Sequence, residues 1–130
     1  MTRYAGSCHC GAVAFEVEAD PIELTVCDCS LCRRRSATMM QVPVGALTIL
    51  RGEDHLALYQ WNTGVARHYF CRVCGIYPFH RKRSDPNSYG VNVGCLEGFD
   101  RAGLPVRRAD GVSMTVESEH PRAEWGGPRV

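Results

Sequence analysis

The sequence lacks an excess of charge of one sign, and this absence argues against two large classes of partner. Its 130 residues carry 15 basic and 14 acidic side chains, which leave a net charge of +1. A near-neutral chain does not present the broad basic surface that nucleic-acid and membrane-surface binding usually require. We therefore expect neither nucleic acid nor a membrane among its partners.

Long apolar runs and helical periodicity are also missing. No stretch is long enough to span a bilayer, and the first ten residues, MTRYAGSCHC, lack the apolar segment of an export signal. We expect a soluble cytoplasmic protein, in which cysteine thiols stay reduced. Because no window repeats its apolar residues every 3.6 positions, we predict at most one helical turn, near residues 31–37.

Short stretches of alternating character indicate an all-β protein. In residues 11–18, GAVAFEVE, apolar side chains at 13, 15 and 17 alternate with glutamates, as expected for a half-buried strand. The NTG sequence at 62–64 marks a hairpin between two further strands. We predict one domain over residues 1–111 and a polar tail over residues 112–130. Other predicted strands lie at 24–26, 39–50, 55–61, 65–70, 76–80 and 88–95.

Cysteine is what the chain has in abundance, and its spacing indicates metal binding. Seven of the eight cysteines fall in C-x-C or C-x2-C patterns. Two such close neighbours are poorly placed to form a disulfide with each other but well placed to bind one ion. The cysteines lie at positions 8, 10, 27, 29, 32, 71, 74 and 95.

The first predicted site joins Cys8 and Cys10 to Cys71 and Cys74. Each pair is followed by glycine, which lets backbone amides approach thiolates. Four thiolates form the closed tetrahedron of structural zinc, which contributes about 10–16 kcal/mol against roughly 4 kcal/mol for closing so long a loop. Free buried thiols are the less favoured alternative, and His9 is interpreted as a bystander.

The second predicted site has only three sulfurs, from Cys27, Cys29 and Cys32. Catalytic zinc keeps three protein ligands and one exchangeable position, so this site suits a thiol substrate, held as thiolate. An internal fourth ligand is the alternative. For Cys95, a role as a small buried apolar residue is favoured over one as a ligand. The other candidates for that position are His55, His68 and His80.

The arginine run that follows, Arg33, Arg34 and Arg35, offers positive charge beside this site. Zinc with three thiolates carries a net negative charge, which would repel an anionic substrate unless cations offset it. These arginines are therefore predicted to bind the thiol's carboxylates, with Arg67 and Arg72 as alternatives. A solvated turn that binds nothing is the other interpretation of the run.

Four motifs in this order, carrying all eight cysteines, resemble the glutathione-dependent formaldehyde-activating enzyme (GFA) family, which also includes the domain of centromere protein V. The resemblance covers about residues 4–100. The motifs are GSCHCGAVAFEV, CDCSLCRRR, NTGVARHYFCRVCG and VNVGCLEG.

The resemblance implies a β-tent fold with two zinc ions per chain. It puts the structural zinc on Cys8, Cys10, Cys71 and Cys74. The site regarded as catalytic falls on Cys27, Cys29 and Cys32. The implied activity is that of a carbon–sulfur lyase that combines glutathione, or a similar small thiol, with formaldehyde to give S-hydroxymethylglutathione.

Two functions without catalysis compete with this one. In a scaffold, both zinc ions are structural and a surface such as HRKR at 80–83 contacts a partner. In a nucleic-acid-binding zinc ribbon, the chain would need a basic surface, and the near-neutral charge argues against it. An open second site favours the enzyme, whereas a fourth protein ligand favours the scaffold.

Overall fold

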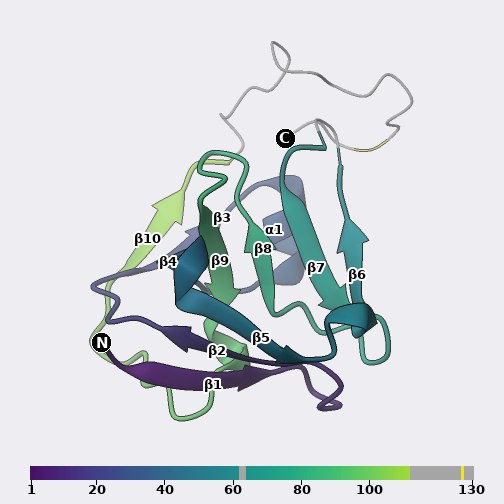
Figure 1. The fold of residues 1–130 in the computed structure, drawn as a ribbon. Helices are drawn as coiled ribbons and strands as arrows, with labels where there is room; N and C mark the ends of the chain where they lie inside the picture. The colour runs from purple at the N-terminus through teal and green to yellow at the C-terminus, as the bar shows by residue number, and fades with distance from the viewer. Residues whose placement is uncertain (62–63, 112–126, 128–130) are drawn as a thin grey trace.

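Two β-sheets and one short helix make up the computed structural model of the chain, which describes residues 1–61, 64–111 and 127 (Figure 1). The smaller sheet has the order β1 (Arg3–Ser7), β2 (Ala14–Glu18), β5 (Leu47–Arg51). The larger sheet has seven strands, in the order β10 (Val106–Ala109), β3 (Leu24–Cys27), β4 (Met39–Pro43), β9 (Ser88–Asn92), β8 (Phe79–Arg81), β7 (Arg67–Cys71), β6 (Leu56–Tyr59). Helix α1 (Ser30–Arg35) follows β3.

The apolar core lies between the two sheets. Alternate side chains of a strand face opposite sides, and one set in each sheet is buried against the other sheet. Phe15 of β2 meets Phe79 of β8 edge to face, with ring centroids 5.3 Å apart. Their buried neighbours in this core include Val17, Leu24, Met40, Val42 and Val91.

The other face of the seven-stranded sheet carries polar side chains and is covered by α1, which lies behind the sheet in Figure 1. His68 of β7 pairs in register with His80 of β8, one residue away from the core pair Tyr69 and Phe79. Alternation therefore directs both histidines away from the core. This polar face, next to the end of β3, is where the candidate site forms.

The structure confirms the predicted all-β class and most of the predicted strands. The helical turn predicted near residues 31–37 is α1. Strands β6 and β7 pair antiparallel as the predicted hairpin, although Asn62 and Thr63 of its turn lie outside the described residues. The predicted tail over residues 112–130 also lies outside them, apart from Gly127.

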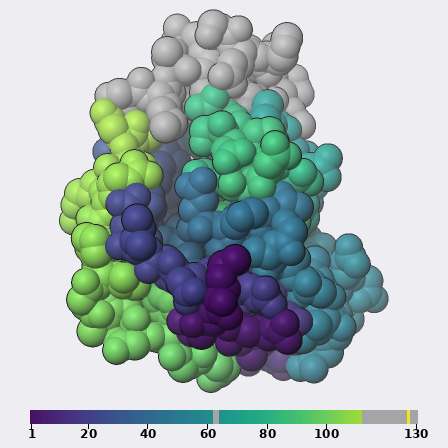
Figure 2. Space-filling model, turned by 60° about the vertical axis from the view of Figure 1, so that its left-hand side comes forward, coloured from purple at the N-terminus to yellow at the C-terminus, as the bar shows by residue number. Residues whose placement is uncertain are grey.

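Two strands were not predicted, and one of them adds a parallel pair. Strand β1 contains Gly6, which lies against the ring of Phe15 where a side chain would collide. Strand β10 is largely exposed and has no apolar alternation. It pairs in parallel with β3, and the two segments lie side by side at the surface in Figure 2.

Within the described part of the chain, no helix has the length and apolar character that a membrane span requires.

Candidate metal centres and the adjoining polar cluster

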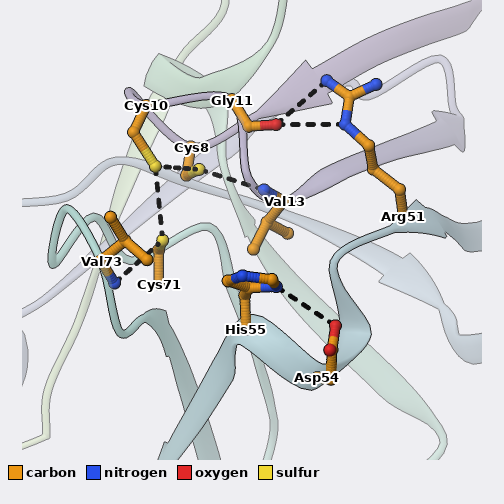
Figure 3. A network of polar contacts seen from close by, with 9 residues as sticks. All are labelled: Cys8, Cys10, Gly11, Val13, Arg51, Asp54, His55, Cys71 and Val73. Carbon is orange, nitrogen blue, oxygen red and sulfur yellow. Dashed lines mark hydrogen bonds and ion pairs between the residues drawn. The ribbon is translucent and has the colours of Figure 1, made fainter.

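Four sulfur atoms from distant parts of the chain converge in what we call the four-cysteine cluster. Figure 3 shows those of Cys8, Cys10 and Cys71. Cys8 and Cys10 follow β1, while Cys71 ends β7 and Cys74 lies in the turn beyond it. All four sulfur atoms lie within 4.8 Å of one another. The cluster thereby joins the small sheet to the large one.

The sulfur spacing in this cluster fits a tetrahedral metal ion. Sγ of Cys10 lies 3.7 Å from Sγ of Cys8 and 3.8 Å from Sγ of Cys71. Zinc–sulfur bonds of about 2.3 Å give a tetrahedron with edges of about 3.8 Å. Disulfide sulfurs would be about 2 Å apart, and these cysteines are free thiols. The donor set therefore fits a closed four-thiolate site.

Backbone amides support the same cluster. The N–H of Val13 donates to Sγ of Cys8 at 3.3 Å, and the N–H of Val73 donates to Sγ of Cys71 at 3.4 Å (Figure 3). Gly11 and Gly75 adopt φ values of 81° and 79°, which side chains disfavour and which the two turns require. Amide hydrogen bonds also lower the pKa of Cys74 to about 6.

Three further sulfurs form the three-cysteine cluster, built on one strand-to-helix turn. Cys27 ends β3, Cys29 is the N-cap of α1 and Cys32 lies in the first turn of α1. Their sulfur atoms lie within 4.8 Å of one another. Sγ of Cys29 accepts a hydrogen bond from the N–H of Cys32 at 3.4 Å, so the same sulfur caps the helix. Hydrogen bonds from the Cys27 and Cys32 thiols hold the pKa of Cys29 well below its ordinary value.

Gly111 closes one side of the three-cysteine cluster. A Cβ on this residue would lie 2.6 Å from Sγ of Cys27 and 2.7 Å from Cβ of Cys29. The N–H of Gly111 donates to Oδ1 of Asp28 at 2.7 Å, and the N–H of Asp28 donates to the carbonyl of Ala109 at 3.3 Å. The residues that follow the parallel strand β10 thus pack against the turn that carries the sulfurs.

Among the described residues, no fourth side chain joins the three sulfurs as a ligand. Cys95 is 8% exposed and packs in the apolar core, where burial raises its pKa to about 11. Its sulfur is directed to the carbonyl of Tyr77, 3.8 Å away. His55 is paired with Asp54 beside the four-cysteine cluster (Figure 3). Two further candidates, His68 and His80, occupy a different cluster, described below.

The three arginines after Cys32 lie in two different environments. Arg33 and Arg34 are exposed, and Nη1 of Arg34 donates to the carbonyl of Ser30 within α1 at 2.8 Å. Arg35 turns inward, where Nη1 lies 3.1 Å from Nδ1 of His68 and Cζ lies 3.6 Å from the ring centroid of Tyr77. The alternatives Arg67 and Arg72 are exposed.

Arg35, His68, Tyr77 and His80 form a closed ring of contacts, which we call the buried polar cluster. Arg35 stacks on Tyr77, and Tyr77 stacks on His80 with ring centroids 5.9 Å apart. His80 lies 5.2 Å from His68, centroid to centroid, and His68 returns to Arg35. The Tyr77 hydroxyl is hydrogen-bonded to Nδ1 of His80. Side chains from a helix, two strands and a loop thus meet as one unit.

Burial sets the charge state of this cluster. Desolvation lowers the pKa of His68 to about 3 and that of His80 to about 4, with the Arg35 charge adding to both shifts. Desolvation also raises the pKa of Tyr77 above its ordinary value. Cys32 and Arg35 lie three residues apart on α1, so one helical turn joins this cluster to the three-cysteine cluster. At neutral pH its only full charge is that of Arg35.

Sequence reasoning did not single out Tyr77 or Gly111. Tyr77 belongs to IYPFH, a stretch that predicts a strand, but the strand begins only at Phe79. The partners of Tyr77 are 3 and 42 residues away in the chain. No local pattern signals such a contact. For Gly111, the signal available was a DG pair directly before the polar tail, which is equally typical of an ordinary turn.

A family model described as glutathione-dependent formaldehyde-activating enzyme (GFA) matches residues 3–108, which include both cysteine clusters. A Halomonas elongata protein named "Putative glutathione-dependent formaldehyde-activating enzyme" is 33% identical over 79 residues. This match covers 53% of the chain and 50% of that relative, so the chain corresponds to about half the relative's length.

A solved structure shares the fold. The crystal structure of a Rhodobacter sphaeroides protein superposes with a TM-score of 0.73 at 45% sequence identity. The match covers 79% of this chain and 99% of that one. The two-sheet architecture described above is therefore also found in an experimental structure.

Proposed function

Because the chain belongs to the GFA family, we propose that it is a metal-dependent carbon–sulfur lyase that adds a small thiol to formaldehyde or a related aldehyde. The proposed thiol is glutathione or a compound like it. In the forward direction a bond forms between the thiol sulfur and the aldehyde carbon, and in reverse the same bond breaks. No oxidant or reductant is needed.

One observation carries this proposal: the two cysteine clusters differ in the number of ligands they offer. The four-cysteine cluster supplies a full tetrahedron, whereas the three-cysteine cluster supplies three sulfurs and, among the described side chains, no fourth ligand. A closed zinc site is typical of structural zinc, and an incomplete one is typical of catalysis. The unequal clusters favour an enzyme over a scaffold with two structural ions.

We propose zinc as the ion in both clusters, because thiolate-rich tetrahedral sites favour it. At the three-cysteine cluster, zinc would hold an incoming thiol as its thiolate near neutral pH. Cys27, Cys29 and Cys32 are the residues that would bind this ion. Backbone N–H groups already donate to two of these sulfurs, from Cys29 to Sγ of Cys27 and from Cys32 to Sγ of Cys29, which favours their thiolate forms.

The chain itself would orient the thiol through charge. Arg33 and Arg34 are exposed on the helix that begins at the three-cysteine cluster, so their guanidinium groups are available to the carboxylates of an anionic thiol. Arg35 is committed to His68 and Tyr77. We therefore assign carboxylate binding to Arg33 and Arg34, and a different task to Arg35.

Cobalt(II) substitution tests whether the three-cysteine cluster accepts a thiol. The sulfur-to-cobalt charge-transfer band reports ligand type and number, so glutathione should strengthen it saturably in the wild-type chain but not in Cys29→Ser. Cys95→Ser serves as the control, because Cys95 belongs to neither cluster. An unchanged band with several thiols would favour the scaffold with two structural ions.

Catalysis needs a separate measurement, because thiols and formaldehyde combine without help. NMR exchange spectroscopy gives the rate at which glutathione and S-hydroxymethylglutathione interconvert, with and without the protein. We expect the protein to accelerate this exchange and Cys29→Ser to lose the effect. Equal rates with and without wild-type protein would leave a thiol-binding protein and not a lyase.

A further inference from the structure

The hydrogen bond between Arg35 and His68 fixes the proton on the His68 ring. A guanidinium group donates hydrogen bonds and cannot accept them. Nδ1 of His68, 3.1 Å from Nη1 of Arg35, must therefore be the acceptor. Burial lowers the pKa of His68 to about 3, so the ring is neutral at pH 7 and has one proton. That proton lies on Nε2.

Nε2–H of His68 is a buried donor that has no acceptor in the part of the chain that the structure describes. His68 is 5% exposed. Among the described residues, its Nε2 is buried and has no hydrogen-bond partner. Leaving such a donor unsatisfied is unfavourable, so a buried unpaired group in a native protein calls for an explanation.

Its neighbours in the buried polar cluster are already engaged. The Tyr77 hydroxyl is bonded to Nδ1 of His80, and Arg35 is held by its bond to His68 and its stacking on Tyr77. The backbone positions are also fixed, because Nδ2 of Asn92 donates to the carbonyl of Tyr77 at 2.9 Å. His80 lies over Gly90, where a Cβ would approach its ring to 2.5 Å. Nε2–H of His68 is thus the unpaired donor of a cluster whose other members are held in place.

The proposed reaction creates an acceptor that needs such a donor. When a thiolate sulfur bonds to the aldehyde carbon, the π-electron pair of the C=O bond moves to oxygen. The oxygen gains negative charge and then takes a proton from water. Donors held in place where this charge develops are often the largest single contribution to catalysis.

We propose that His68 is a catalytic residue, whose Nε2–H donates a hydrogen bond to the oxygen of the aldehyde and of the hydroxymethyl product. Arg35 is a positioning residue, which keeps the proton on Nε2 by donating to Nδ1. This inference rests on the proposed function and assigns the aldehyde's oxygen to the buried polar cluster. The group that reaches this donor is small, the aldehyde or the hydroxymethyl end of the adduct, since the donor lies in the interior.

Nitrogen-15 NMR of histidine-labelled protein with both metals bound tests the binding step without activity. We expect Nε2 of His68 to be protonated and Nδ1 to be a hydrogen-bond acceptor. Glutathione added with formaldehyde should shift the Nε2 signal. S-ethylglutathione, which has the shape of the adduct but no hydroxyl oxygen, should not. A proton on Nδ1, or equal responses to both probes, would overturn the proposal.

Substitutions test the catalytic step. His68→Phe keeps a flat ring but removes the donor, and we expect the NMR exchange rate to fall about 100-fold, as when an oxyanion-hole donor is removed. His68→Gln can place an amide N–H near the Nε2 position and should recover at least tenfold of that loss. Arg35→Ala should move part of the His68 population to the Nδ1-protonated form in the nitrogen-15 spectrum. A His68→Phe variant that folds, binds both metals and exchanges at the wild-type rate would refute the proposal.

Failure of the proposed function would look different. A wild-type chain that does not accelerate exchange would count against the lyase. A selective Nε2 shift with the oxygen-bearing adduct would still support binding of its oxygen by His68, and absence of that shift would overturn the inference. Because the spectrum reports the hydrogen bond directly, it decides the inference whichever way the rate measurement turns out.

Discussion

A Cβ on Gly111 would lie 2.6 Å from Sγ of Cys27, so the backbone after β10 packs directly on the three-cysteine cluster. We predict that Gly111→Ala disturbs this cluster alone, because a methyl group must displace either a sulfur or the turn that carries it. The expected loss of stability is about 1–3 kcal/mol, as for overpacked cores. Elemental analysis should find the metal content fall from two ions per chain towards one.

Gly45→Ala is the matched control for this prediction. Gly45 has no heavy atom within 4 Å of the position of a Cβ, and its φ value is not in the left-handed region. This variant should therefore keep both ions. Retention of two ions by Gly111→Ala would mean that the segment after β10 yields easily and does not shape the cluster.

The metal clusters could be predicted from the sequence because their ligands are close neighbours in the chain. A C-x-C or C-x2-C pattern constrains two sulfurs through one turn, so only the pairing of the distant halves Cys8–Cys10 and Cys71–Cys74 had to be inferred. The strands could also be predicted wherever apolar and polar residues alternate, as in β2. Such local constraints act before tertiary structure forms.

The buried polar cluster could not be predicted in the same way. It depends on α1 packing behind the large sheet so that Arg35 reaches a strand 33 residues further along the chain. Strand β1 was also not predictable, because of its glycine. Gly6 interrupts the apolar pattern of β1 because the ring of Phe15 occupies the space of its side chain. Both features are set by contacts between elements and leave no periodic signal.

The two cysteine clusters should differ in what their loss does to the fold. Cys71 is fully buried and links β7 to Cys10 in the other part of the chain. Structural zinc contributes about 10–16 kcal/mol, as much as or more than the net free energy of unfolding of most domains. Cys71→Ser should therefore unfold the protein. Cys29→Ser should lose one ion and stay folded. Circular dichroism with elemental analysis distinguishes the two results.

A control for both variants is Cys95→Ser, which places a hydroxyl in the apolar core without touching either cluster. It should lower the free energy of unfolding modestly and retain two ions. If Cys71→Ser and Cys29→Ser unfold to the same extent, the division into a structural and an exchangeable site is wrong.

The exposed arginines should affect ligand affinity more than stability. Arg33→Ala and Arg34→Ala remove exposed charges, which usually contribute about 0–1 kcal/mol to folding. Their loss should weaken the binding of glutathione, an anionic thiol, but not of uncharged 2-mercaptoethanol. Calorimetry with both thiols measures the difference. Unchanged glutathione binding in the double variant would assign these two arginines to a solvated turn.

Arg35→Ala should behave in the opposite way. It leaves Nδ1 of His68 buried without its donor and uncovers the ring of Tyr77. A loss of about 1–3 kcal/mol in the free energy of unfolding is expected from the unpaired group. Urea denaturation of Arg33→Ala and Arg35→Ala under the same conditions makes the comparison. Equal stabilities would show that the inward contacts of Arg35 contribute nothing to the fold.

The buried histidines should make folding stability depend on pH below about 6.5, the ordinary histidine pKa. Burial lowers the pKa of His68 to about 3 and that of His80 to about 4. Between pH 6.5 and 4 the unfolded chain therefore binds protons that the folded chain does not. Stability rises with pH wherever the unfolded state binds more protons, so it should fall as the solution is acidified through this window.

His68→Gln isolates the contribution of His68, because glutamine cannot take up the proton while cysteine protonation and metal loss continue in both proteins. Below pH 6.5, wild type should lose up to about 1.4 kcal/mol more per pH unit than this variant. His9→Gln, at an exposed histidine, is the matched control and should follow wild type. Urea denaturation at pH 7.5, 6.5, 5.5 and 4.5 gives the slopes. Parallel slopes for wild type and His68→Gln would mean that His68 takes up a proton in the folded protein as readily as in the unfolded chain. Below pH 6.5 its ring would then carry protons on both nitrogens, and Nδ1 could not accept the hydrogen bond from Arg35 there.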